Sequence, residues 1–123
     1  MGRNKKKKGK GKFVQLDHWL LRQPAWRALK SGPRDLYVEL KMRYNGFNNG
    51  SIFLSQRDAA EALNITRETV ASYFAELEVK GFILKTEGHC LGSDGRGRAA
   101  KWALTELEMD GVTATKDFLK WKK

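Results

Sequence analysis

Three stretches of the 123-residue chain place apolar side chains at the spacing of an α-helix. In each stretch the apolar positions fall on one face of a 3.6-residue period, which predicts a helix with one buried side. These faces are Leu36, Tyr37, Leu40 and Tyr44 within 34–44, then Ala59, Ala60 and Leu63 after Ser55, and finally Val70, Phe74 and Leu77 after Thr66. Together the three faces predict a three-helix core.

Local signals mark where the second and third helices begin and end. Ser55 and Thr66 are favourable N-cap residues, because a side-chain hydroxyl accepts a hydrogen bond from a free amide of the first turn. Only a tight turn fits between the helices at 63–65, and Asn64 adopts the left-handed backbone conformation more readily than most residues. Gly81 stands where a helix commonly ends in a left-handed residue.

Short apolar runs on either side of these helices predict a small sheet. Residues 51–54 (SIFL) and 82–87 (FILKTE) are strand candidates, and 100–105 (AKWALT) is predicted to be a returning strand. The intervening residues 88–97 are rich in glycine, serine and aspartate, which is typical of a loop. Strand, loop and strand predict a β-hairpin.

Aromatic residues are concentrated near both ends of the chain. From Phe13 onward an aromatic lead-in contains a short predicted helix that starts at Pro24 and ends near Leu29, and it must be buried on its own domain or on a second copy. Trp26 and Trp102 are predicted to lie in the core, and the histidine at position 18 is predicted to pack. Residues 115–121 form a possible short helix with large apolar side chains at Phe118, Leu119 and Trp121.

These elements predict a mainly α-helical fold with a small β-hairpin wing, a winged helix-turn-helix of the α+β class. The predicted domain spans residues 13–106, with a disordered basic arm at 1–12 and a tail at 107–123. The third helix is expected to enter the major groove of double-stranded DNA, because its opening residues are small, polar or basic. We expect base contacts from Thr66, Arg67, Glu68, Thr69 and Ser72, with Arg67 placed to read guanine.

Charge is distributed unevenly. The net charge is +10, and the first 12 residues hold seven basic and no acidic side chains, so the other 111 residues carry only +3. A basic arm attracts polyanions of any sequence through counterion release, with phosphate contacts expected from Lys5, Lys6, Lys7 and Lys8; the alternative is a tail that only improves solubility. Residues 66–80 carry two bases and three acids, so the third helix adds no net positive charge of its own. Its affinity for DNA would then depend on the arm and on Arg96 and Arg98 of the wing, which could reach a minor groove.

The segment DAAEALNITRETVASYFAELEVKGFI resembles the winged helix-turn-helix of the gluconate-repressor (GntR) family of bacterial regulators. The resemblance covers about thirty residues, or about fifty with the wing. It implies DNA contacts by Arg57, Thr66, Arg67 and Thr69, with Arg57 on the backbone. Glu68 and Ala71 depart from the family pattern, because a small polar residue and a second arginine are common there. We expect no effector-binding domain within these 123 residues.

The longer pattern of helix, YNG-type turn, short strand and LSQRDAAEAL is also similar to winged helices of small phage and plasmid proteins, including replication initiators. The expected function is therefore sequence-specific binding of double-stranded DNA by a homodimer, in transcription regulation of a bacterial or mobile-element gene. Two half-sites would lie about 34 Å apart. One alternative is an accessory factor in replication or recombination that binds a protein through Phe118, Leu119 and Trp121. Another is a protein-interaction module without specific DNA binding.

Several classes of function find no support in the sequence. There is no glycine-rich phosphate loop, metalloprotease motif or nucleophile beside a base, so we expect no enzyme and no cofactor. His89 and Cys90 cannot complete a zinc site, and a single cysteine cannot form an intramolecular disulfide. No apolar run approaches the roughly 20 residues of a membrane helix. The expected location is the cytoplasm, in association with the nucleoid.

Overall fold

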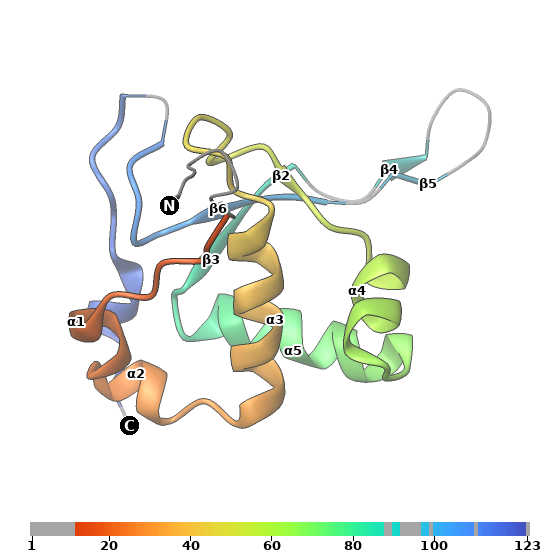
Figure 1. Ribbon diagram of the computed structural model, residues 1–123, viewed down its shortest axis with the longest axis horizontal. Coiled ribbons are helices and arrows are strands. Elements are labelled where there is room, and N and C mark those ends of the chain that lie inside the picture. The colour runs from red at the N-terminus through yellow and green to blue at the C-terminus, as the bar shows by residue number, and fades with distance from the viewer. Residues whose placement is uncertain (1–11, 88–89, 92–96, 99, 110, 123) are drawn as a thin grey trace, which may run out of the picture.

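The computed structural model describes residues 12–87, 90–91, 97–98, 100–109 and 111–122, which combine helices with a small antiparallel sheet (Figure 1). Two short helices precede a longer one, and two more helices lie between the first strand and the rest of the sheet. In chain order the elements are α1 (His18–Leu21), α2 (Pro24–Arg27), α3 (Ser31–Met42), β2 (Ile52–Phe53), α4 (Gln56–Leu63), α5 (Arg67–Val79), β3 (Ile83–Glu87), β4 (Cys90–Leu91), β5 (Gly97–Arg98), β6 (Lys101–Leu104) and the 3₁₀-helix η1 (Asp117–Lys120). The mixed α+β class expected from the sequence is confirmed.

The sheet has the order β2-β6-β3, and every pairing in it is antiparallel. Ile52 lies opposite Trp102, and Ile83 lies opposite Leu104. The register shifts between Lys85 and Glu87, as at a β-bulge, which bends a strand and increases its twist. Beyond this point β4 pairs with β5, and Figure 1 shows this second ladder extending away from the body of the molecule. The predicted hairpin is therefore present in the described residues.

The predicted helix boundaries are confirmed at the caps. The Ser55 hydroxyl accepts from the Asp58 amide at 2.9 Å, and the Thr66 hydroxyl accepts from the Thr69 amide at 3.2 Å. Helix α3 differs from its prediction by starting three residues early, at Ser31, because Lys30 is extended and Pro33 fits the first turn. Helix α1 was not predicted, since four residues are too few to show a period, and its His18 is exposed instead of packed.

Aromatic rings from four parts of the chain form the centre of the core. Phe82 makes edge-to-face contacts with Trp26 and Tyr37 at centroid distances of 5.6 and 5.9 Å, and it stacks on Phe118 at 5.0 Å. Phe74 stacks on Trp102 at 5.1 Å. The part of the lead-in from Leu20 to Leu29 is therefore packed on its own domain, while Phe13 and Trp19 stay 80% and 43% exposed. The core positions predicted for Trp26 and Trp102 are confirmed.

The C-terminal segment, predicted as a tail at 107–123, packs on the domain. The Lys116 amide donates to the Thr105 carbonyl at 2.8 Å, and Phe118 is only 2% exposed. The segment crosses the chain at Gly81, where a Cβ atom would lie 2.7 Å from backbone atoms of Asp117 and Phe118. Gly81 also has a φ of +86°, so both its conformation and this close crossing favour glycine. The folded unit therefore extends to η1.

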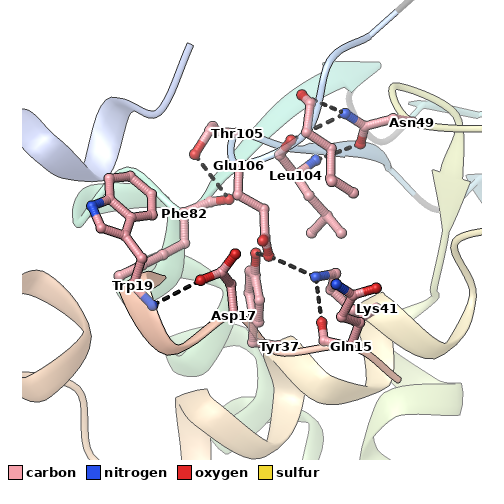
Figure 2. Close-up of polar contacts among 11 residues, drawn as sticks. Gln15, Asp17, Trp19, Tyr37, Lys41, Asn49, Phe82, Leu104, Thr105 and Glu106 are labelled. Atoms are coloured by element: carbon pink, nitrogen blue, oxygen red, sulfur yellow. Dashed lines mark hydrogen bonds and ion pairs between the residues drawn. The ribbon is translucent and has the colours of Figure 1, made fainter. Parts of the chain in front are cut away.

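Asn49 is a buried polar residue that ties the loop before β2 to the end of β6. Its side-chain oxygen accepts from the Leu104 amide at 2.6 Å (Figure 2). Its amide group donates to the carbonyls of Leu104, Leu107 and Glu108 at 3.0–3.1 Å. Buried backbone groups are costly when they lack a partner, so Asn49 satisfies groups that the sheet leaves free. This contact fixes where β6 ends and the C-terminal segment begins.

A second buried polar cluster joins α3 to Glu106, just after β6. The Tyr37 hydroxyl donates to the Glu106 carboxylate, whose other partner is the Lys41 ammonium at 2.9 Å, and Lys41 also donates to the Gln15 carbonyl at 2.7 Å (Figure 2). The Lys41 and Glu106 side chains are only 8% and 9% exposed. The cluster therefore holds the lead-in, α3 and the C-terminal segment together.

Stability should fall above about pH 10 because of Tyr37. Burial raises the pKa of the Tyr37 phenol well above its ordinary value of 10.0, and the nearby Glu106 carboxylate raises it further. A raised folded-state pKa stabilises the fold below the unfolded pKa of about 10, and this contribution is lost as the pH rises through the folded value. Urea titrations between pH 8 and 11 should show this decline, and Tyr37→Phe should flatten it. Tyr44→Phe is the matched control and should keep the wild-type decline of stability with pH. If Tyr37→Phe kept that decline too, Tyr37 would not be its cause.

Candidate nucleic-acid interface

The junction between α4 and α5 has the tight geometry that the sequence predicted. Asn64 has φ 59° and ψ 49°, in the left-handed region, and the Ile65 amide donates to the Ala60 carbonyl at 3.0 Å. Ala59 and Ala60 are buried, so α5 approaches α4 closely, and Ile65 packs against the core. The start of α5 is therefore held in a fixed orientation relative to α4 and α3.

The first two turns of α5 present a polar surface. Thr66, Arg67, Glu68 and Ser72 are exposed, and Thr69 is half-buried. The hydroxyls are already used within the helix: those of Thr66 and Thr69 lie 2.9 Å apart, and that of Ser72 donates to the Thr69 carbonyl at 2.7 Å. Within the part of the chain that the structure describes, Arg67 and Glu68 form no ion pair. These two charged side chains are thus the groups most available to a ligand.

An open hollow of about 470 Å³ lies at the same junction. Arg57 from the first turn of α4 and Arg67 from the first turn of α5 both line it, together with Glu61 and the Asn64 turn. Arg57 is exposed, so both guanidinium groups can reach an anion at this surface. The sequence prediction did not include Glu61, although its position four residues after Arg57 places it on the same helix face.

The local charge at this surface is not strongly positive. Arg57 and Arg67 are accompanied by the exposed acids Asp58, Glu61 and Glu68. A duplex carries one negative charge per about 1.7 Å of its axis, so this surface alone offers little net positive charge to a polyanion. The predicted phosphate contacts Lys5, Lys6, Lys7 and Lys8 lie outside the described residues.

The hairpin is described in part. The Arg98 backbone pairs with Cys90 in the outer ladder, while Arg96 lies outside the described residues. Closer to the body, the Lys85 ammonium lies 5.4 Å from the centre of the Trp102 ring, and Lys101 pairs with Glu87 at 3.3 Å. The backbone at position 98 therefore lies in the outer ladder. Contact of Arg96 or Arg98 with a minor groove stays a prediction.

The three predicted partner-binding residues of the C-terminal segment differ in exposure. Phe118 is a core residue, which corrects its prediction as a surface anchor, because it stacks on Phe82. Leu119 is 51% exposed. Trp121 is half-buried, with the Lys80 ammonium 5.2 Å from the centre of its ring. Only Leu119 is largely accessible to a partner in this arrangement.

The described ranges also bear on two other kinds of site, a metal centre and a membrane span. Nowhere in them do three or more His, Cys, Asp or Glu side chains gather as a metal site would require. Among the helices that the structure describes, none is both long and apolar enough to cross a bilayer. Comparison of the chain with protein-family models, with curated proteins and with solved structures gives no significant match.

Proposed function

We propose that the protein binds double-stranded DNA in a sequence-specific manner through a winged helix-turn-helix, as a regulator of transcription. The observation that carries the proposal is the α4–α5 junction, where a fixed left-handed turn presents the polar start of α5 with Arg57 and Arg67 on one hollow. A helix held this way can place its opening residues against base edges while the preceding helix crosses the backbone. In this proposal α5 reads bases and α4 contacts phosphate.

The order of elements supports the proposed fold. A helix, a strand, two helices and a two-stranded hairpin follow one another as α3, β2, α4, α5 and β3–β6, and β2 completes the sheet by pairing with β6. Figure 1 shows the outer ladder β4–β5 extending on the same side of the molecule as α4. A wing and the α4–α5 junction on one side could contact adjacent grooves of a single duplex.

Because the α4–α5 junction has little net positive charge, we assign specificity and affinity to different parts of the chain. Arg67 contributes specificity, because its guanidinium can form a bidentate contact with guanine, and Glu68 can accept from the amino group of cytosine. The lysine-rich first 12 residues contribute affinity without specificity.

Arg67→Ala tests the proposal. We expect the variant to lose roughly 1–3 kcal/mol of discrimination, or about five- to 150-fold in Kd for the preferred duplex. Binding to an unrelated duplex should change little, because phosphate contacts elsewhere supply most of it. Fluorescence anisotropy with both duplexes at fixed salt measures the two affinities.

Arg27→Ala is the matched control, since Arg27 is exposed on α2 and forms no ion pair in the described ranges. It should keep the full discrimination between the two duplexes. Equal discrimination in the wild-type protein and in Arg67→Ala would mean that α5 does not read the DNA.

A further inference from the structure

The 3₁₀-helix η1 and helix α1 together form a surface, residues 17–22 and 116–122, that leaves two large apolar side chains in water. The two elements meet where the Trp19 ring contacts the buried Phe118 ring edge-to-face, at a centroid distance of 5.7 Å. Trp19 is nevertheless 43% exposed, and Leu119, the next residue after Phe118, is 51% exposed. The Leu119 amide donates to the Lys116 carbonyl at 3.0 Å, so the backbone beneath this α1–η1 surface is fixed.

The charge of the α1–η1 surface is positive. Its two segments hold four bases and two acids, a net charge of +2 with histidine neutral. One of the acids, Asp17, already caps α1, because its carboxylate accepts from the Trp19 amide at 2.8 Å. Lys116, Lys120 and Lys122 form no ion pair with any carboxylate in the described ranges. Their ammonium groups therefore keep donors for an anionic partner.

The two indole rings of this region are poorly placed to stack on nucleic-acid bases. The Lys116 ammonium lies over the Trp19 ring, 5.1 Å from its centre, and the Lys80 ammonium lies over the Trp121 ring at 5.2 Å. A base that stacks on an aromatic side chain needs a free ring face. One face of each indole is already covered by a cation, which disfavours single-stranded nucleic acid as the partner.

Two other occupants fit this surface less well than an acidic peptide. Figure 1 shows α1 and the C-terminal segment at the opposite end of the molecule from α4 and the β4–β5 ladder, so a duplex on the α4–α5 junction leaves this end free. A phosphate backbone also presents no apolar side chain to Trp19 and Leu119. A second copy of the chain carries the same net charge of +10, and like charges that face each other oppose association.

We propose that the α1–η1 surface binds an acidic segment of a partner protein. A large apolar side chain of that segment packs on Trp19 and Leu119, and its carboxylates contact Lys116, Lys120 and Lys122. Burial of apolar area provides the affinity, and the lysines select acidic over basic or neutral sequences. The inference does not depend on DNA binding, because the two surfaces share no residue.

An array of random synthetic peptides, probed with the labelled full-length protein at moderate salt, tests the proposal. The peptides that bind should combine aspartate or glutamate with leucine, phenylalanine or tryptophan. The best of them is then titrated in solution by fluorescence anisotropy. Leu119→Ser should weaken its binding about tenfold, because the apolar contact is lost. Lys120→Glu should weaken it as well, because a carboxylate of the peptide would then face a like charge.

Met42→Ser and Lys85→Glu are the matched controls, since both residues are exposed and lie outside the α1–η1 surface, on α3 and β3. Both should bind the peptide like the wild-type protein, and circular dichroism should show that all variants keep the fold. Every variant retains the basic first 12 residues, so equal binding by Leu119→Ser and Lys120→Glu would place the peptide elsewhere and overturn the proposal. An array without enrichment of acidic peptides, or oligothymidine binding that Leu119→Ser removes, would overturn it too.

Discussion

Phe82→Ala should cost about 3–5 kcal/mol of the free energy of unfolding, a large part of the stability of a domain of this size. Phe82 is fully buried and contacts the rings of Trp26, Tyr37 and Phe118. Removing its ring would leave a cavity where the lead-in, α3 and the C-terminal segment meet. Urea denaturation followed by circular dichroism measures the loss.

Phe53→Ala is the matched control, because Phe53 lies on the edge strand β2 and is 53% exposed. Its loss should be less than about 1 kcal/mol, since half of the ring is already in water. If both variants lost the same stability, the aromatic cluster would not be the centre of the core.

Glu106→Ala should destabilise the protein by about 3–5 kcal/mol, because it removes one partner of a buried ion pair. Lys41, whose side chain is only 8% exposed, would lose its carboxylate partner, and the Tyr37 hydroxyl would lose its acceptor. The same urea titration measures the effect.

A surface ion pair gives the comparison for this second variant. Glu87 pairs with Lys101 at 3.3 Å, but both side chains are more than 40% exposed. Glu87→Ala should therefore cost no more than about 1 kcal/mol. Replacing Glu106 by leucine together with Lys41 by methionine should recover part of the loss, because no charge then remains buried. A double variant less stable than Glu106→Ala would contradict the desolvation argument.

Local features of the fold followed from the sequence because a few adjacent residues determine them. The caps at Ser55 and Thr66 and the left-handed turn at Asn64 each depend on one side chain and its neighbours. The helix faces followed from periodicity, and α3 was misplaced by three residues at its start and by two at its end, since it spans Ser31–Met42 instead of 34–44. The mixed helix and sheet composition followed from these elements.

Contacts between distant parts of the chain could not be predicted in this way. Tyr37 and Glu106 are 69 positions apart, and neither residue has a local pattern that points to the other. The crossing at Gly81 buries Phe118, although a short segment with three apolar residues does not show which of them faces the core. For this reason the C-terminal segment was predicted to lie outside the domain.

The candidate site was predicted in its residues but not in its contacts. The sequence predicted that Thr66, Arg67 and Ser72 open a DNA-reading helix, and the structure exposes all three. It could not show that the hydroxyls of Thr66 and Ser72 are engaged within the helix, which leaves Arg67 and Glu68 as the charged groups most available to bases. The specificity proposed for α5 therefore depends mainly on two adjacent side chains.

Selection of bound sequences from a pool of random duplexes, at moderate salt, tests the central claim most directly. It compares the full chain, the chain without residues 1–12 and the Arg67→Ala variant. Our account predicts that the first two enrich the same sequence, that removal of the arm lowers affinity and its salt dependence, and that Arg67→Ala loses the enrichment. No enriched sequence with either of the first two proteins, or the same enrichment with Arg67→Ala, would contradict it.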